Sequence, residues 1–144
     1  MLDIEQMAST RIVIVDDHEL ARRGLRSVLQ NNPDLQVIAE IASGEEAVQR
    51  AEELHPDIIL LDITLPRMNG IEAAGRIHQS SPTSRVIFVS QHDSVVLAKD
   101  ALRAGGCAYV VKSDAGRDLL SAISAVQAGK TFVSRTLLAR GWNS

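Results

Sequence analysis

The stretch that decides the fold is Ile58-Ile59-Leu60-Leu61-Asp62-Ile63-Thr64-Leu65-Pro66, an apolar run of strand length that ends at one carboxylate and then meets a proline. A short, continuous apolar run bounded by turn-forming residues is typical of a strand buried on both faces, as in parallel sheets covered by helices. In open α/β sheets, ligands bind where the strands end. We therefore expect Asp62 to lie at the carboxyl edge of a sheet, facing a crevice.

Outward from this stretch, apolar runs alternate with segments of helical periodicity along the chain. Ser43 and Glu46 have the spacing of a capping box, which marks the start of one helix. Because a parallel crossover needs a helix to carry the chain back, the alternation predicts an α/β fold, a doubly wound sheet of five parallel strands with helices on both faces. The other expected strands are residues 11–15, 37–41, 86–89 and 108–111, and the expected helices are residues 20–29, 44–54, 71–80, 95–102 and 119–126.

Length and composition indicate one globular domain. At 144 residues the chain is long enough for a real core but short for two domains. No stretch approaches the roughly 20 apolar residues that span a bilayer, and the N-terminal residues lack the pattern of a secretory signal. We therefore expect a cytoplasmic protein with no membrane role, in which residues 1–10 form a flexible leader, residues 11–129 the folded domain, and residues 130–144 a C-terminal tail or truncated linker.

Charge and cysteine content argue against two further classes of function. The formal net charge of −3 gives no general attraction to nucleic acid, whose binding depends on neutralising phosphates. Cys107 is the only cysteine, which excludes an internal disulfide and a thiolate metal cluster. DNA binding is therefore not expected of this chain by itself.

Polar residues follow the predicted strands at the points where they end: Asp16 and Asp17, Asp62, Ser90 and Lys112. All of these ends lie on the same edge of a parallel sheet, so the residues can form one site. Carboxylates crowded together repel unless they share a cation, and hard oxygen ligands suit Mg²⁺. The sequence therefore predicts a site for Mg²⁺ or Mn²⁺.

The chemistry that fits this set of residues is phosphoryl transfer, in which catalysis is mostly positioning and charge neutralisation. Asp62 is the candidate nucleophile, since a carboxylate can accept a phosphoryl group as an acyl phosphate. We expect Asp17, Asp62 and the backbone carbonyl of Thr64 to bind the metal, with Asp16 acting directly or through water. Lys112 would supply a compact positive charge to a phosphate oxygen.

Each of these residues also has a plain structural interpretation. Asp16 and Asp17 could favour the positive end of a helix dipole, Asp62 could form a turn, Ser90 could cap a helix, and Lys112 could be a solvated charge. Ser90 in the functional interpretation donates a hydrogen bond to a phosphate oxygen. Their joint position at consecutive strand ends favours the functional interpretation.

With these residues identified, the sequence resembles the receiver domains of response regulators in bacterial two-component signalling. The resemblance covers residues 11–129 and implies a CheY-like (flavodoxin-like) sheet of strand order 2-1-3-4-5. Lys112-Ser113 and residues 17–22 are most similar to the LuxR/NarL/FixJ-type subfamily. The resemblance to receiver domains is carried by the motifs Val15-Asp16-Asp17-His18, residues 61–71, Val89-Ser90, and residues 104–112.

The resemblance implies a phosphorylation switch rather than an enzyme with a separate substrate. Asp62 would accept a phosphoryl group from a sensor histidine kinase, or from a small phosphodonor, in a phosphorelay. Ser90 and Tyr109 would be the switch residues that change the surface formed by the fourth helix, the fifth strand and the fifth helix. The expected partners are the kinase and, on phosphorylation, a second copy of the chain; DNA and transcription would be reached only through an output domain not in this chain.

Some positions depart from the family pattern. Gln91 follows Ser90 where a small residue is usual, so we expect it to slow phosphorylation by small donors or to slow loss of the phosphoryl group. Thr64 and His92 flank the site and could tune attack by water. Ser113 stands where many receivers have proline, so a cis bond after Lys112 would cost about 3 kcal/mol.

Two other functions stay open at this point. An aspartyl-phosphate hydrolase also uses a strand-end aspartate with Mg²⁺, but it would need a second acid where Thr64 stands. A receiver-like interaction module that takes no phosphoryl group is the other alternative. The other histidines, His18, His55 and His78, are expected to be helix-end or surface residues.

Overall fold

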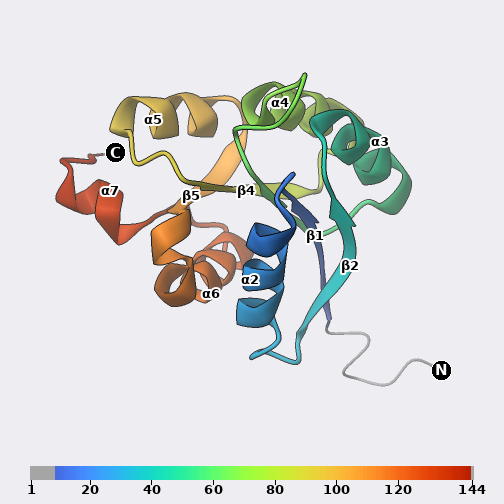
Figure 1. Cartoon of the computed structure of the whole chain (residues 1–144), viewed down its shortest axis with the longest axis horizontal. Coiled ribbons are helices and arrows are strands. Elements are labelled where there is room, and N and C mark those ends of the chain that lie inside the picture. Colours follow the sequence, from blue (N-terminus) through green and yellow to red (C-terminus); the bar gives the residue numbers. More distant parts are fainter. Residues whose placement is uncertain (1–8, 144) are drawn as a thin grey trace.

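A parallel sheet forms the centre of the computed structural model, which describes residues 9–143. Within those residues it has six strands in the order β2-β1-β3-β4-β5-β6. Helices cover both faces of this sheet (Figure 1). The strands are β1 (Thr10–Val15), β2 (Leu35–Ile41), β3 (Ile58–Leu61), β4 (Arg85–Ser90), β5 (Gly106–Val111) and β6 (Phe132–Val133). The helices are α2 (Glu19–Leu29), α3 (Gly44–Leu54), α4 (Gly70–Ser80), α5 (Val95–Arg103), α6 (Ala115–Gln127) and α7 (Arg135–Ala139), with a 3₁₀ turn η1 (Lys112–Asp114) before α6.

The central strand β3 contributes to two cores, one on each face of the sheet. Successive side chains of a strand point to opposite faces. Ile59 and Leu61 pack in the core formed with α3, α4 and α5, whereas Ile58 and Leu60 pack in the core formed with α2 and α6. All four side chains are at most 1% exposed. The apolar stretch before Asp62 is therefore a strand buried on both faces, as predicted.

The predicted α/β fold and the strand order 2-1-3-4-5 are confirmed, with one addition at the edge of the sheet. Strand β6 pairs with the outer side of β5, where Phe132 lies opposite Ala108 and Val133 opposite Tyr109. A strand of two residues is too short to give a detectable alternation of apolar and polar residues. The sequence therefore predicted five strands, and the structure has a short sixth.

Residues 130–143, which we call the C-terminal segment, contain β6 and α7. Ser134 N donates to the Tyr109 carbonyl at 2.9 Å, and Leu137 is fully buried in the core that also holds α5. The sequence predicted a tail or truncated linker after residue 129, and that domain boundary stays a prediction. The structure adds that this segment is packed against the domain.

At the other end of the chain, β1 begins at Thr10, the last residue of the predicted leader. Residues 1–8, the rest of that leader, lie outside the described residues. Among residues 9–143, no helix is both long and apolar enough to cross a membrane.

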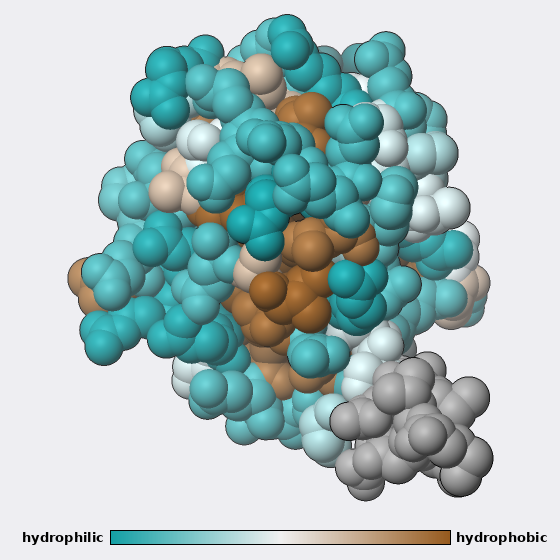
Figure 2. All heavy atoms as spheres, turned by 90° about the vertical axis from the view of Figure 1, so that its right-hand side faces the viewer, coloured by the Kyte–Doolittle hydropathy of each residue, from teal (hydrophilic) through white to brown (hydrophobic). Residues whose placement is uncertain are grey.

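The outer strand on the far side of the sheet is β2. Its pairing with β1 shifts at one point, since Ile12 lies opposite Val37 but Val13 lies opposite Ala39, so Ile38 is an extra residue and forms a bulge. Most of the apolar residues of β2 are only half-buried. Figure 2, which faces the side of the molecule where β2 lies in Figure 1, shows apolar side chains gathered in the middle of that face.

Candidate functional site

The backbone of Asp62 is fixed directly after β3. Its N–H donates to the Val15 carbonyl at 3.0 Å, which extends the pairing of β1 and β3 by one residue. On the other side, a Cβ at Gly70 would lie 2.0 Å from the Asp62 carbonyl oxygen. Only glycine therefore lets α4 begin this close to Asp62. Asn69 caps α4 by accepting a hydrogen bond from the N–H of Glu72 at 2.9 Å.

The pair Asp16-Asp17 follows β1 on the same edge of the sheet. Asp16 N donates to the Ile41 carbonyl at 2.9 Å, and the Asp16 side chain is 1% exposed. The N–H of His18 donates to Asp16 Oδ1 at 2.9 Å, and Arg22 donates to the Asp16 carbonyl at 2.6 Å. Asp17 is about a third exposed. One carboxylate is thus held inside the site, and the other lies at its surface.

Lys112, the first residue after β5, joins the two buried carboxylates. Its Nζ lies 2.7 Å from Asp16 Oδ2 as an ion pair and donates a hydrogen bond to Asp62 Oδ2 at 3.1 Å. Burial alone would lower the pKa of Lys112, but the hydrogen bond and charge of Asp16 and of Asp62 outweigh burial and raise that pKa above its ordinary value. Lys112 therefore stays protonated at neutral pH and offsets part of the negative charge.

Asp62 is 4% exposed, and its environment disfavours its charged form. Burial raises the pKa of Asp62, the Lys112 ammonium opposes that rise, and repulsion from Asp16 adds to it. Its Oδ1 atom is buried and has no partner in hydrogen-bond geometry in the described part of the chain, although the Thr64 backbone N–H lies near enough to the carboxylate to lower its pKa. A buried carboxylate oxygen without a partner is uncommon in folded proteins and is available to a ligand.

The acidic side chains fit a divalent cation. Carboxylate oxygens of Asp16, Asp17 and Asp62 and a ring nitrogen of His18 lie within 4.8 Å of one another. Hard oxygen donors of this kind suit Mg²⁺ or Mn²⁺, and the unpartnered Oδ1 of Asp62 leaves a donor for the ion. The structure thus brings together three of the predicted metal ligands. The Thr64 carbonyl as a further ligand stays a prediction.

A chain of hydrogen bonds connects Ser90, His92, Tyr109 and Thr64. Ser90 Oγ accepts from His92 N at 3.1 Å, and Tyr109 OH donates to the His92 carbonyl at 2.8 Å. The His92 ring nitrogen Nε2 lies 2.8 Å from Thr64 Oγ1, in hydrogen-bond contact. Ser90 and Tyr109 are fully buried, and burial raises the pKa of the Tyr109 phenol. His92 therefore links the loop after β3 to the loop after β4 and to β5.

Three further positions discussed from the sequence are His18, Gln91 and the Lys112–Ser113 bond. The side chain of His18, expected to be an ordinary helix-end residue, lies with Nδ1 3.1 Å from Asp17 Oδ1 and 3.4 Å from Asp16 Oδ1. His18 is the residue before α2, as expected of a helix-end residue, and its position directly after two acidic residues places it near them, whereas the rotamer that makes the contact is not determined by the sequence. Gln91 is exposed. The Lys112–Ser113 bond is trans, so the strained alternative does not occur.

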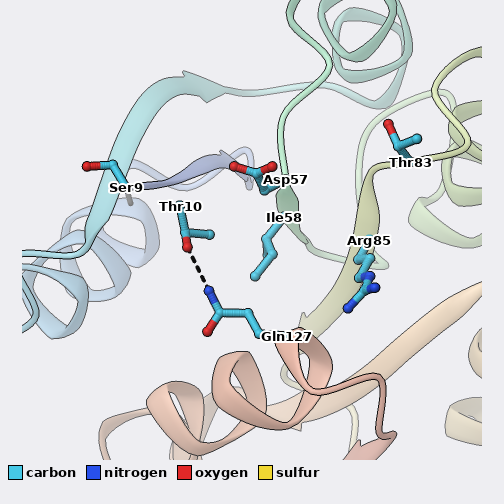
Figure 3. Close-up of a pocket in the computed structure, with 7 residues that line it drawn as sticks. All are labelled: Ser9, Thr10, Asp57, Ile58, Thr83, Arg85 and Gln127. Carbon is cyan, nitrogen blue, oxygen red and sulfur yellow. Dashed lines mark hydrogen bonds between the residues drawn. The ribbon is translucent and has the colours of Figure 1, made fainter. Parts of the chain in front are cut away.

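A separate pocket lies at the opposite, amino-terminal edge of the sheet (Figure 3). Thr10, at the start of β1, and Gln127, at the end of α6, close one side of it through a hydrogen bond of 2.6 Å. Asp62 and its partners follow the carboxyl ends of the strands. This pocket is therefore not part of the acidic site. Its lining residues are Ser9, Thr10, Asp57, Ile58, Thr83, Arg85 and Gln127.

Comparison with known proteins identifies the family of the chain. Residues 12–124 match the family described as "Response regulator receiver domain". The nitrate/nitrite response regulator protein NarL of Escherichia coli is 35% identical over 128 residues, which cover 88% of this chain and 58% of NarL. The transcriptional regulatory protein DegU of Brevibacillus brevis is 35% identical over 85% of this chain and 52% of DegU. The chain thus spans little more than half the length of these curated relatives.

A solved structure gives the same result. The two-component response regulator of the LuxR family from Aurantimonas sp. SI85-9A1 is 36% identical, with a TM-score of 0.86 over 91% of this chain and 94% of that one. The matched residues contain Asp16, Asp17, Asp62, Ser90 and Lys112, the strand-end residues described above. The chain belongs to the response regulator receiver domain family and is similar to its LuxR-type members.

Proposed function

We propose that Asp62 is the phosphoacceptor of this receiver domain and that its phosphorylation switches a protein-binding surface. The observation that carries this proposal is the state of Asp62 itself. One of its carboxylate oxygens is held by Lys112 at 3.1 Å, while the other is buried without a partner in the described residues. A carboxylate oriented by one oxygen and open at the other is suited to form one new bond.

In this mechanism Asp62 Oδ1 attacks the phosphorus of the donor, and the bond from phosphorus to the donor's leaving group breaks as the new P–O bond forms. A bound Mg²⁺ or Mn²⁺, held by Asp16, Asp17 and Asp62 with the Thr64 carbonyl, would neutralise charge on the phosphoryl oxygens. Lys112 contributes a positive charge from the protein. Because burial disfavours the charged form of Asp62, the carboxylate needs a neighbouring positive charge to react as the anion, and Lys112 supplies one.

Ser90 and Tyr109 are the proposed switch residues. A phosphoryl oxygen on Asp62 would accept a hydrogen bond from the Ser90 hydroxyl, and movement of Ser90 toward that oxygen would weaken the bond that its Oγ accepts from His92 N. Since Tyr109 OH donates a hydrogen bond to the His92 carbonyl, a movement of His92 would change how Tyr109 packs in the core that it shares with α5. Thr64, Gln91 and His92 are the proposed tuning residues. A local charge would in this way bias a surface formed by α5, β5 and α6 between two arrangements.

The proposed partners follow from the family and from the relatives. A sensor histidine kinase would supply the phosphoryl group, and the phosphorylated chain would form a homodimer. DegU is named as a transcriptional regulatory protein, and this chain covers 52% of it. We propose that any contact with DNA is made by an output domain outside this chain. We also propose that the protein is cytoplasmic and has no membrane role. The only reactions proposed for the chain are phosphorylation and dephosphorylation of Asp62.

Acetyl phosphate with Mg²⁺ tests the function directly. Intact-mass measurement should show one phosphoryl group, peptide mapping should locate it at Asp62, and Asp62→Asn should remove it. Asp34→Asn, a neutralised aspartate on the surface, is the matched control. A stable mass gain supports the switch, whereas rapid release of inorganic phosphate would support an aspartyl-phosphate hydrolase. No modification of the parent under any donor would support an inert interaction module.

A further inference from the structure

The C-terminal segment lies after the residues that match the family, yet it reaches the loop beside the phosphorylation site. Arg140 Nη2 lies 2.8 Å from Asp93 Oδ2. Asp93 belongs to the loop between β4 and α5, directly after His92. An ion pair thus joins the end of the chain to the loop that carries the hydrogen bonds of His92 to Thr64, Ser90 and Tyr109.

The start of the segment is anchored at the end of β5, next to Lys112. Ser134 is fully buried; its Oγ accepts from Val111 N at 3.2 Å and donates to Asp114 Oδ2 at 2.8 Å. Arg135 makes hydrogen bonds of 3.1 to 3.2 Å from its backbone and guanidinium to the buried carboxylate of Asp118. This end of the segment is therefore fixed to β5, η1 and α6.

The far end of the segment is folded back against α5. Gly141 has a φ of +92°, which glycine adopts without strain, and Trp142 N then donates to the Leu137 carbonyl at 3.0 Å. Trp142 lies 5.8 Å from Lys99 Nζ, measured to the ring centroid, and Lys99 also donates to Asn143 at 3.3 Å. Figure 1 shows α7 beside α6 at the edge of the sheet, with the chain end below α5. The segment spans the surface proposed as the switch.

Arg140 is thus held on both sides. Leu137, one turn before it in α7, is fully buried, and Trp142, two residues after it, packs on the core. Exposed ion pairs are usually weak because two long side chains lose freedom when they pair. The anchored flanks already fix the backbone of Arg140, so only side-chain freedom is lost when the ion pair forms. The contact with Asp93 can therefore restrain the loop although Arg140 is 57% and Asp93 47% exposed.

We propose that Arg140 is a positioning residue for the phosphorylation site. Through Asp93 it holds the loop after β4 in the place where His92 bridges to Thr64 across the loops that flank Asp62. Breaking this contact frees the loop, lets donor and water reach Asp62 more easily, and speeds both gain and loss of the phosphoryl group. In the other direction, a change of the loop on phosphorylation reaches the C-terminal segment, because coupling between two sites is reciprocal. This inference rests on the proposed function of Asp62.

The test compares phosphorylation and dephosphorylation rates of the full chain with acetyl phosphate at fixed Mg²⁺. Arg140→Gln and Asp93→Asn should each raise both rates about two- to fivefold, the range of one exposed ion pair. The double variant should equal either single variant, because both remove the same contact. Arg140→Lys should have rates closer to those of the parent than Arg140→Gln has, because lysine keeps the positive charge beside Asp93. Arg103→Gln is the matched control, since Arg103 pairs with Asp100 within α5 at 3.4 Å and should leave the rates unchanged.

The fluorescence of Trp142, the only tryptophan of the chain, gives a second readout. Phosphorylation should change its emission in the parent but not in Asp62→Asn, and Arg140→Gln should reduce the change. This inference alone would be overturned if the parent is phosphorylated and Arg140→Gln has the same rates and emission as the parent. Additive effects of the two substitutions in the double variant would also overturn it. A parent that takes no phosphoryl group at all would overturn the proposed function and this inference together.

Discussion

Replacement of Lys112 by methionine should destabilise the metal-free protein by about 3 kcal/mol. The ammonium lies 2.7 Å from an Asp16 oxygen and 3.1 Å from an Asp62 oxygen. At an effective dielectric constant near 20 these two contacts correspond to about 6 and about 5 kcal/mol of gross attraction. Desolvation cancels much of this, and the lysine is 24% exposed. The net loss therefore falls at the lower end of the roughly 3–5 kcal/mol that follows removal of one partner from a buried pair.

The loss should depend on pH in a direction that the structure fixes. In the parent the pKa of Asp62 is already raised, so the folded state binds the proton more tightly than the unfolded chain does. Stability from such a group grows as pH falls through its folded-state pKa. Without Lys112 the two carboxylates repel more strongly, so the deficit of Lys112→Met should be largest at neutral pH and shrink as Asp62 becomes protonated. Saturating Mg²⁺ should stabilise the variant more than the parent, because the ion replaces the missing positive charge.

Urea unfolding followed by far-UV circular dichroism, with and without Mg²⁺, measures both effects. Lys130→Met is the matched control, because Lys130 is exposed and makes no ion pair in the described part of the chain. Lys112→Met/Asp62→Asn should recover most of the loss, since one of the repelling charges is gone. A pH-independent loss, or a deficit of the same size in Lys130→Met, would refute the electrostatic reasoning.

Three other outcomes follow from the same structure. Gly70→Ala should destabilise by about 3 kcal/mol or more, since its Cβ would lie 2.0 Å from the Asp62 carbonyl oxygen and the backbone must move; an unchanged urea midpoint would contradict that close approach. Leu137→Ala, at a fully buried side chain, should cost about 2–5 kcal/mol in the same assay, and no loss would show that the C-terminal segment folds independently of the core. Gln91→Ala should change the unfolding free energy by less than about 0.5 kcal/mol, since the side chain is exposed, yet speed phosphorylation by acetyl phosphate; equal rates would remove Gln91 as a tuning residue.

Most of the site could be predicted because it depends on the fold more than on side-chain detail. Asp62 and Lys112 each follow a strand that the sequence marks by a run of apolar residues, Ser90 is the last residue of another, and parallel strands bring their ends to one edge. The ion pairs of Lys112 then follow from charge and proximity. Side-chain direction was harder to predict: the contact of His18 with the acidic pair depends on a rotamer at the start of a helix, which spacing does not determine.

The C-terminal segment could not be read from the sequence for a different reason. Its strand has two residues and its helix five, and both are too short for a repeating apolar pattern to be recognised. The ion pair of Arg140 with Asp93 joins residues far apart in the chain, and the sequence around either residue does not predict it. Such contacts arise from the docking of whole elements, so they become visible only once the sheet and its helices are assembled.

The extra residue at Ile38 has a consequence for the behaviour of the protein at high concentration. An outer strand such as β2 presents unpaired N–H and C=O groups on which the strand of another molecule can add, and half-buried apolar side chains would favour that association. A bulge increases the local twist and breaks the regular spacing of those groups. Beside it, Glu40 forms ion pairs with Arg22 and Arg26, which keeps charge at the edge. We therefore expect the bulge and the ion pairs together to disfavour edge-to-edge association at β2.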